Sequence, residues 1–206
     1  MTEKRVEIVV TNTIVGNYEA RSYPSDQIDK DGYYPLYRVP VFKIIVTGID
    51  TSGSKKAYEF MAPRFMPYFN DPLKPKPHYR TKGWVNSGLS AQRTIVVTRY
   101  NQSYEVQNRY SPGKGAIVIQ DTFYIHAGPA SLLEYGFGSA GCIEIIGNYD
   151  NFKNAIAELS GVSKTTSDNS IDRLVKARKL IVSIQAAAAP DIKSAYIRKV
   201  LNWNFK

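Results

Sequence analysis

The sequence is poor in the residues that build disulfide frameworks and metal sites. It contains one cysteine, Cys142, and two histidines, His78 and His126, among 206 residues. A single cysteine excludes an internal disulfide and a zinc site made from several cysteines. Two histidines are also too few for a histidine-rich metal site.

The sequence also lacks a long hydrophobic run and a recognisable export signal. No apolar stretch approaches 18 residues, so we expect no membrane span. The first ten residues, MTEKRVEIVV, carry four charged side chains and have neither an apolar central region nor a small-residue cleavage site. This pattern differs from a Sec-type signal peptide, which predicts synthesis in the cytoplasm.

Acidic residues are outnumbered, since 27 Lys and Arg stand against 18 Asp and Glu, a net charge of +9. The excess is concentrated in residues 55–82 and 173–206. Such a surface attracts polyanions, but charge alone does not separate nucleic acid, a membrane surface and an anionic cell-wall polymer. A solvated surface without a specific partner is an equally simple interpretation.

Four segments have the pattern of β-strands. Apolar residues alternate along Val6–Val10, and β-branched residues dominate Val39–Thr47, Arg93–Tyr100 and Ala116–His126. Five prolines within residues 63–77 exclude a central strand or a helix interior there.

The C-terminal third predicts helices. Apolar residues recur at helical spacing from Phe152 to Leu159, and a second helix begins at Ile171 with Ser170 as its N-cap. Leu180–Ile184 fits a helix or a strand, and the residues beyond Pro190 fit a third helix. We therefore predict one α+β domain over residues 1–206, mainly antiparallel and β-rich, with a motif-bearing core at 93–160 and a helical, basic part at 161–206.

One segment concentrates the residue types of cysteine catalysis. A predicted strand ends at His126, a glycine-rich turn follows, and Cys142 precedes a second extended run. A reactive cysteine needs a base, partial exposure and backbone N–H groups directed at the reacting oxygen. The small residues Ser139, Ala140 and Gly141 allow consecutive amides to point toward one site. We expect the two strands to pair antiparallel, so that His126 is the base for Cys142.

Two pieces of this segment resemble the L,D-transpeptidase (YkuD-like) family. They are Ile125-His126-Ala127-Gly128 and Ser139-Ala140-Gly141-Cys142-Ile143, and the turn Ser111-Pro112-Gly113 before the histidine strand is similar to the family's turn. The resemblance implies a β-rich catalytic domain acting on peptidoglycan stem peptides without metal or cofactor. It makes Cys142 the nucleophile and His126 the general base. The implied oxyanion donors are the backbone amides of Ala140, Gly141 and Cys142, and Ser139, Gly128 and Glu144 are the residues that shape the site.

Glu144 stands where many members of this family have an arginine. A glutamate does not attract a substrate carboxylate, so this contact comes from elsewhere, such as Arg109 or residues 55–82, or the site prefers a free amine.

The resemblance predicts a cysteine acyl-transfer enzyme, active as an L,D-transpeptidase, an L,D-carboxypeptidase or a D-amino acid exchanger. Combined with the absent signal, it is typical of toxins that a type VI secretion system delivers to a rival's periplasm. The expected site of action is then the periplasm or cell wall after non-Sec secretion, and an immunity protein is an expected partner.

Three alternatives stay open from the sequence. The first is an inactive module that binds the cell wall or an anionic polymer. The second is nucleic-acid binding through residues 55–84, although no helix-turn-helix or RNA-binding signature is present and we expect no nucleic-acid partner. The third is a cysteine protease acting on ordinary peptides.

Overall fold

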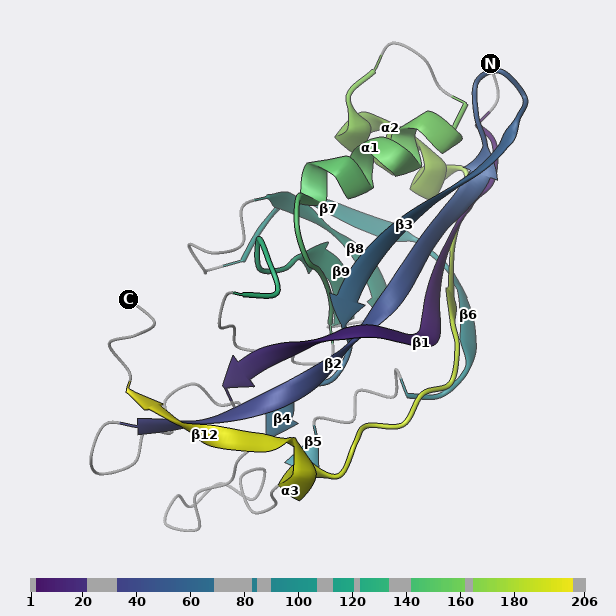
Figure 1. Ribbon diagram of the computed structural model, residues 1–206. Coiled ribbons are helices and arrows are strands. Elements are labelled where there is room, and N and C mark those ends of the chain that lie inside the picture. The colour runs from purple at the N-terminus through teal and green to yellow at the C-terminus, as the bar shows by residue number, and fades with distance from the viewer. Residues whose placement is uncertain are drawn as a thin grey trace.

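The computed structural model of the protein shows two main β-sheets, with two of the helices packed together at one end (Figure 1). It describes residues 3–21, 33–68, 83–84, 90–106, 113–120, 123–133, 142–161 and 165–201. The architecture is α+β and rich in strands, with mostly antiparallel pairing, which confirms the predicted class.

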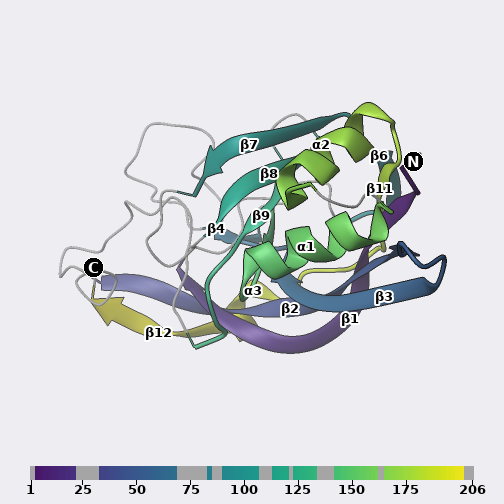
Figure 2. The same ribbon diagram turned by 90° about the horizontal axis from the view of Figure 1, so that it is seen from above.

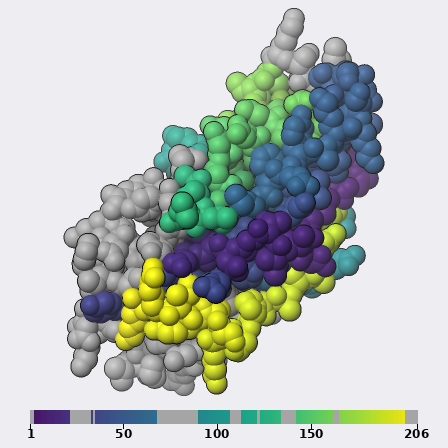
Figure 3. Space-filling view, viewed as in Figure 1, coloured from purple at the N-terminus to yellow at the C-terminus, as the bar shows by residue number. Residues whose placement is uncertain are grey.

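The larger sheet is built around two long strands. Its members are β1 (Val6–Arg21), β2 (Tyr33–Ile49), β3 (Lys55–Pro63), β6 (Arg93–Val96), β11 (Leu180–Ile184) and β12 (Tyr196–Leu201). They follow the order β12-β2-β1-β11-β6, and β3 pairs with a different stretch of β2 from the one that pairs with β12. Because β11 pairs with β1, an early and a late segment of the chain lie side by side, and Figure 3 shows purple and yellow surfaces next to each other.

The smaller sheet carries the predicted catalytic segment. It has the order β10-β9-β8-β7, formed by β7 (Arg99–Glu105), β8 (Lys114–Gln120), β9 (Phe123–Ala127) and β10 (Ile143–Ile145). A separate short pair consists of β4 (Pro67–Tyr68) and β5 (Gly83–Trp84).

Both predicted helices after Asn148 are present. Helix α1 (Tyr149–Leu159) begins at Asn148, whose side chain accepts hydrogen bonds from the backbone N–H groups of Asp150 and Asn151. Helix α2 (Ser167–Lys176) is capped by Thr166, so the predicted cap at Ser170 is wrong; Ser170 is buried inside the helix. A short third helix is α3 (Ile192–Ala195).

The main core lies between the two sheets and beneath the helices (Figure 2). Val6, Ile8 and Val10 of β1 are fully buried there, because the strand's alternation directs these three side chains to one face. Ile117 of β8 and Phe152 of α1 join the same cluster. Two sheets and two helices thus share one apolar interior.

Two predicted strands are each divided in the structure. Arg93–Tyr100 divides at Val97 and Thr98 into β6 and β7, which belong to different sheets. Ala116–His126 divides into the hairpin β8–β9, in which Gln120 pairs with Phe123. The apolar pattern continues across both points of division, so it did not predict them. Local patterning does not determine which sheet a residue joins.

The end of the chain also differs from the prediction. Leu180–Ile184, which the pattern left open, is the strand β11, parallel to β1. The helix predicted beyond Pro190 is wrong apart from α3, since Tyr196–Leu201 forms the edge strand β12. Tyr196–Leu201 pairs with the stretch of β2 that β3 leaves unpaired, and this pairing outweighs the weak helical spacing of these residues. No helix in the described part of the chain is long and apolar enough to cross a membrane.

Candidate active site

The residues on either side of the glycine-rich segment meet on adjacent strands. Strand β9 pairs with β10 in parallel, so that Ile143 lies opposite Ile125 and Glu144 lies opposite His126. The predicted antiparallel pairing is therefore wrong. Parallel strands require a crossover of about a dozen residues or more, and the connection from Gly128 to Gly141 has that length.

The register divides these strands into two faces. Ile125, Ala127, Ile143 and Ile145 point into the main core and are almost completely buried. His126 and Glu144 therefore project from the opposite face, and Cys142, two residues before Glu144, projects with them. Strand spacing and rise place the Cα atoms of Cys142 and His126 about 8 Å apart, as diagonal neighbours.

The His126 imidazole is oriented by its own backbone. Its Nδ1 lies 2.8 Å from the carbonyl oxygen of Ala127. A carbonyl oxygen only accepts hydrogen bonds, so Nδ1 carries the hydrogen and Nε2 keeps its lone pair when the ring is neutral. His126 is 4% exposed, and burial lowers its pKa below the ordinary value, while the bond to Ala127 acts in the opposite direction. The resting side chain is thus a neutral imidazole with Nε2 available as a base.

The Cys142 side chain is a thiol at neutral pH. It is 9% exposed, and burial raises its pKa to about 11. A hydrogen bond from the backbone of Tyr124 lowers the pKa, and the nearby carboxyl of Glu144 raises it. Nucleophilic attack from this site consequently requires a base that removes the proton as the reaction proceeds, because little thiolate exists beforehand.

Glu144 is the acidic neighbour of this pair. Its side chain is partly buried, and desolvation raises the pKa of its carboxyl to about 8. At pH 7 the carboxyl is mainly protonated, and a protonated carboxyl donates a hydrogen bond. Glu144 therefore adds much less negative charge to the site than an ionised glutamate would.

Two tyrosines complete this face of the sheet. The ring of Tyr104 lies 5.4 Å from the His126 ring and 5.1 Å from the Tyr124 ring, measured between centroids. Burial and the proximity of Cys142 raise the pKa of Tyr104. Sequence reasoning missed Tyr104, although a strand extended past Tyr100 would have brought it to this sheet.

Gly128 directly follows β9 and lies in close contact with β10. Its N–H donates to the carbonyl oxygen of Ile145 at 2.8 Å. A Cβ atom added to Gly128 would lie 2.8 Å from that oxygen and 3.0 Å from the Cβ of Glu144. Only glycine fits here without displacing the strand that follows Cys142.

Two sets of polar contacts join the helices to the sheet that carries the site. The hydroxyl of Tyr149 donates to the carbonyl oxygen of Ile125 at 3.2 Å, directly before His126. Nearby, Asp168 of α2 accepts hydrogen bonds from Tyr100 and, at 3.1 Å, from Lys153. These bonds attach both helices to the sheet that carries Cys142 and His126.

Ser139, Ala140 and Gly141 lie outside the described residues, as do His78, Arg109, Ser111 and Pro112. Of the predicted oxyanion donors, the structure describes only Cys142, which directly precedes β10. The described residues include no group of three or more His, Cys, Asp or Glu side chains arranged to hold a metal ion.

Comparison of the chain with protein-family models, with curated proteins and with solved structures gave no match.

Proposed function

We propose that the protein is a cysteine acyl-transfer enzyme that acts on peptidoglycan stem peptides. The observation that carries this proposal is the placement of Cys142 and His126 on one face of neighbouring strands, with the imidazole neutral and Nε2 unprotonated. The substrate class rests on the resemblance of the segments around His126 and Cys142 to L,D-transpeptidases.

The first half-reaction forms a thioester. As Sγ of Cys142 attacks the carbonyl carbon of the third stem residue, its proton moves to Nε2 of His126. The backbone N–H groups that the resemblance implies as oxyanion donors, those of Ala140, Gly141 and Cys142, stabilise the negative oxygen that develops. The C–N bond then breaks, and Nε2 returns the proton to the departing amine of the terminal D-amino acid.

The second half-reaction releases the acyl group. His126 removes a proton from the attacking acceptor, the acceptor's nitrogen or oxygen bonds to the thioester carbon, and the C–S bond breaks. The thiolate then recovers a proton from the imidazolium. A stem-peptide amine as acceptor gives a cross-link, a D-amino acid gives exchange, and water gives a carboxypeptidase.

The test is to incubate the protein and its Cys142→Ala variant with muropeptides carrying tetrapeptide and pentapeptide stems, and to separate the products by mass. We expect loss of a terminal D-alanine, or gain of one cross-link or one exchanged D-amino acid, only with Cys142 present. His126→Gln serves as a second variant, since it removes the base and leaves the thiol. Unchanged muropeptides with the folded wild-type protein would refute the proposal.

A second function is favoured by one observation. The burial that raises the pKa of Cys142 to about 11 is typical of an inert structural cysteine. The corresponding function is a non-catalytic module that binds the cell wall through its basic segments. Incubation with a carbapenem separates the two, because acylation of Cys142 requires a thiol that attacks at a stem-peptide site.

A further inference from the structure

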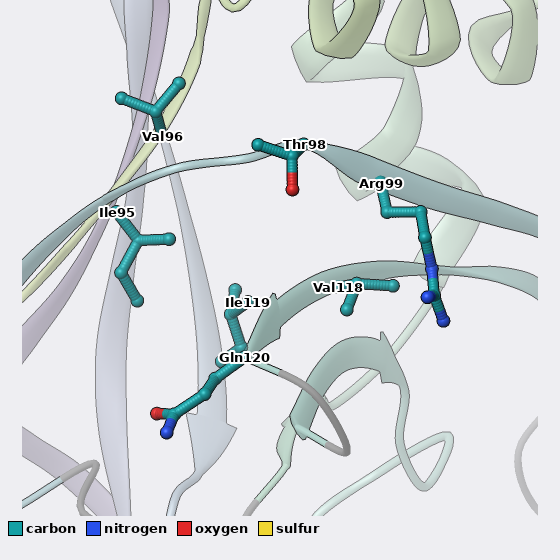
Figure 4. Close-up of a pocket in the computed structure, with 7 residues that line it drawn as sticks. All are labelled: Ile95, Val96, Thr98, Arg99, Val118, Ile119 and Gln120. Carbon is teal, nitrogen blue, oxygen red and sulfur yellow. The ribbon is translucent and has the colours of Figure 1, made fainter.

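Arg99 is an exposed cation on the sheet that carries Cys142 and His126. It begins β7, and within the described part of the chain its guanidinium has neither an ion-pair nor a hydrogen-bond partner. Its side chain lines a hollow together with Val118 and Ile95, and Figure 4 shows it running across β8 beside Val118. A cation with no partner in a lined hollow is available to a ligand.

The register places Arg99 in line with the nucleophile. Arg99 lies opposite Val118, and Val118 lies opposite Tyr124. Because Ile143 lies opposite Ile125, Cys142 follows as the neighbour of Tyr124. Directly opposed residues share a face, so Arg99, Val118, Tyr124 and Cys142 form one row across four strands.

The dimensions of this row suit one particular anion. Neighbouring strands are about 4.8 Å apart, which places the Cα atoms of Arg99 and Cys142 about 14 Å apart. An extended arginine side chain covers a large part of that span. In a peptide cleaved at its last bond, the terminal carboxyl carbon lies one residue length, at most about 3.3–3.6 Å, from the scissile carbonyl carbon. A terminal carboxylate therefore falls between the thiol and the guanidinium.

The surroundings of the row favour such a ligand. Val118 provides a small, partly buried apolar surface between the cation and Tyr124. At the other end of the hollow, Gln120 accepts a hydrogen bond of 2.7 Å from Arg93, which orients its amide. Arg93 brings a second positive charge toward the same hollow.

We propose that Arg99 binds the free C-terminal carboxylate of the peptide acyl donor and thereby selects peptides with a single residue after the scissile bond. This inference rests on the proposed acyl-transfer function, since it takes Cys142 as the point of attack. Arg99 is a specificity-determining residue in this scheme, because a planar guanidinium binds a carboxylate through two parallel hydrogen bonds.

The test compares a tetrapeptide stem ending in D-alanine with the same peptide ending in D-alanine amide. We expect Arg99→Gln to reduce kcat/KM for the acid by about 10- to 100-fold and to leave the amide nearly unchanged. The kcat/KM of Arg99→Lys for the acid should lie between the values for the wild type and Arg99→Gln, since lysine retains the charge but does not form two parallel hydrogen bonds. Arg38→Gln, at an exposed arginine of β2 in the other sheet, is the matched control and should change neither.

Binding to the Cys142→Ala protein keeps this inference separate from the reaction itself. There we expect the acid to bind more tightly than the amide, and Arg99→Gln to abolish the difference. Preferential binding of the acid that depends on Arg99, without turnover by the wild type, would refute the reaction and retain the carboxylate site. Equal binding of acid and amide, or a preference that survives Arg99→Gln, would overturn the role of Arg99.

Discussion

Gly128→Ala should damage both the stability of the fold and the site. The added methyl group would lie 2.8 Å from the carbonyl oxygen of Ile145 and 3.0 Å from two atoms of Glu144. These neighbours are backbone or close to it, so β10 must move away from β9. The movement also strains the 2.8 Å hydrogen bond between Gly128 N–H and Ile145.

The expected loss of stability follows from these contacts. Overpacking of this kind costs about 1–3 kcal/mol, and a weakened backbone hydrogen bond costs about 1 kcal/mol more. Replacing glycine restricts the unfolded chain and returns about 0.4–1 kcal/mol. The free energy of unfolding should therefore fall by about 1–3.6 kcal/mol, a large share of the ~5–15 kcal/mol typical of a domain.

Urea unfolding followed by far-UV circular dichroism measures this loss, and alkylation of Cys142 by iodoacetamide reports on the site. We expect faster alkylation in Gly128→Ala, because displacement of β10 exposes the thiol. Gly16→Ala is the matched control: Gly16 also lies in a strand, and a Cβ there meets only Leu132 at 3.5 Å. A change in unfolding free energy within 0.5 kcal/mol of the Gly16→Ala value would refute the reasoning about close approach.

Three further predictions address the side chains around Cys142. In the folded protein the pKa of Glu144 is raised from 4.5 to about 8, so between these pH values the folded state binds more protons than the unfolded state. The free energy of unfolding should therefore decrease as the pH rises from 4.5 to about 8. Urea unfolding at several pH values should show that Glu144→Gln flattens this decrease. Tyr104→Leu removes the ring packed against His126, so water should reach the imidazole and its pKa should rise toward the ordinary value in an NMR titration, whereas an unchanged pKa would show that Tyr104 does not shield it. Tyr149→Phe should lower the free energy of unfolding by about 1 kcal/mol through loss of the bond to Ile125, and no loss in urea unfolding would mean that this bond contributes nothing.

The charge state of the site changes how its sequence is understood. Glu144 and Cys142 both suggest anionic groups when the sequence is considered alone, yet burial keeps both mainly protonated at neutral pH. His126 is neutral for the same reason. The cationic side chain in line with Cys142 is Arg99, which comes from a strand more than forty residues earlier in the chain.

Several features could be predicted from the sequence because they depend on neighbouring residues. The alternation along Val6–Val10 led to a strand with one buried face, and the spacing from Phe152 to Leu159 led to α1. The family resemblance predicted His126 and Cys142 as the reacting pair, and the structure places these two residues close together, at the paired strands β9 and β10. Each of these features is a local periodicity or a short motif, which the chain carries wherever it folds.

Only the tertiary structure decided how these pieces are combined. Parallel pairing of β9 and β10, the division of Arg93–Tyr100 between two sheets, and β12 in place of a helix all depend on which distant strand offers free hydrogen-bonding groups. The same holds for the row from Arg99 to Cys142 and for the pKa of Glu144. Register and burial depend on which distant segments pack together. The sequence therefore identifies the residues that take part in the site, but their protonation state, orientation and neighbours are determined only by the packed sheets.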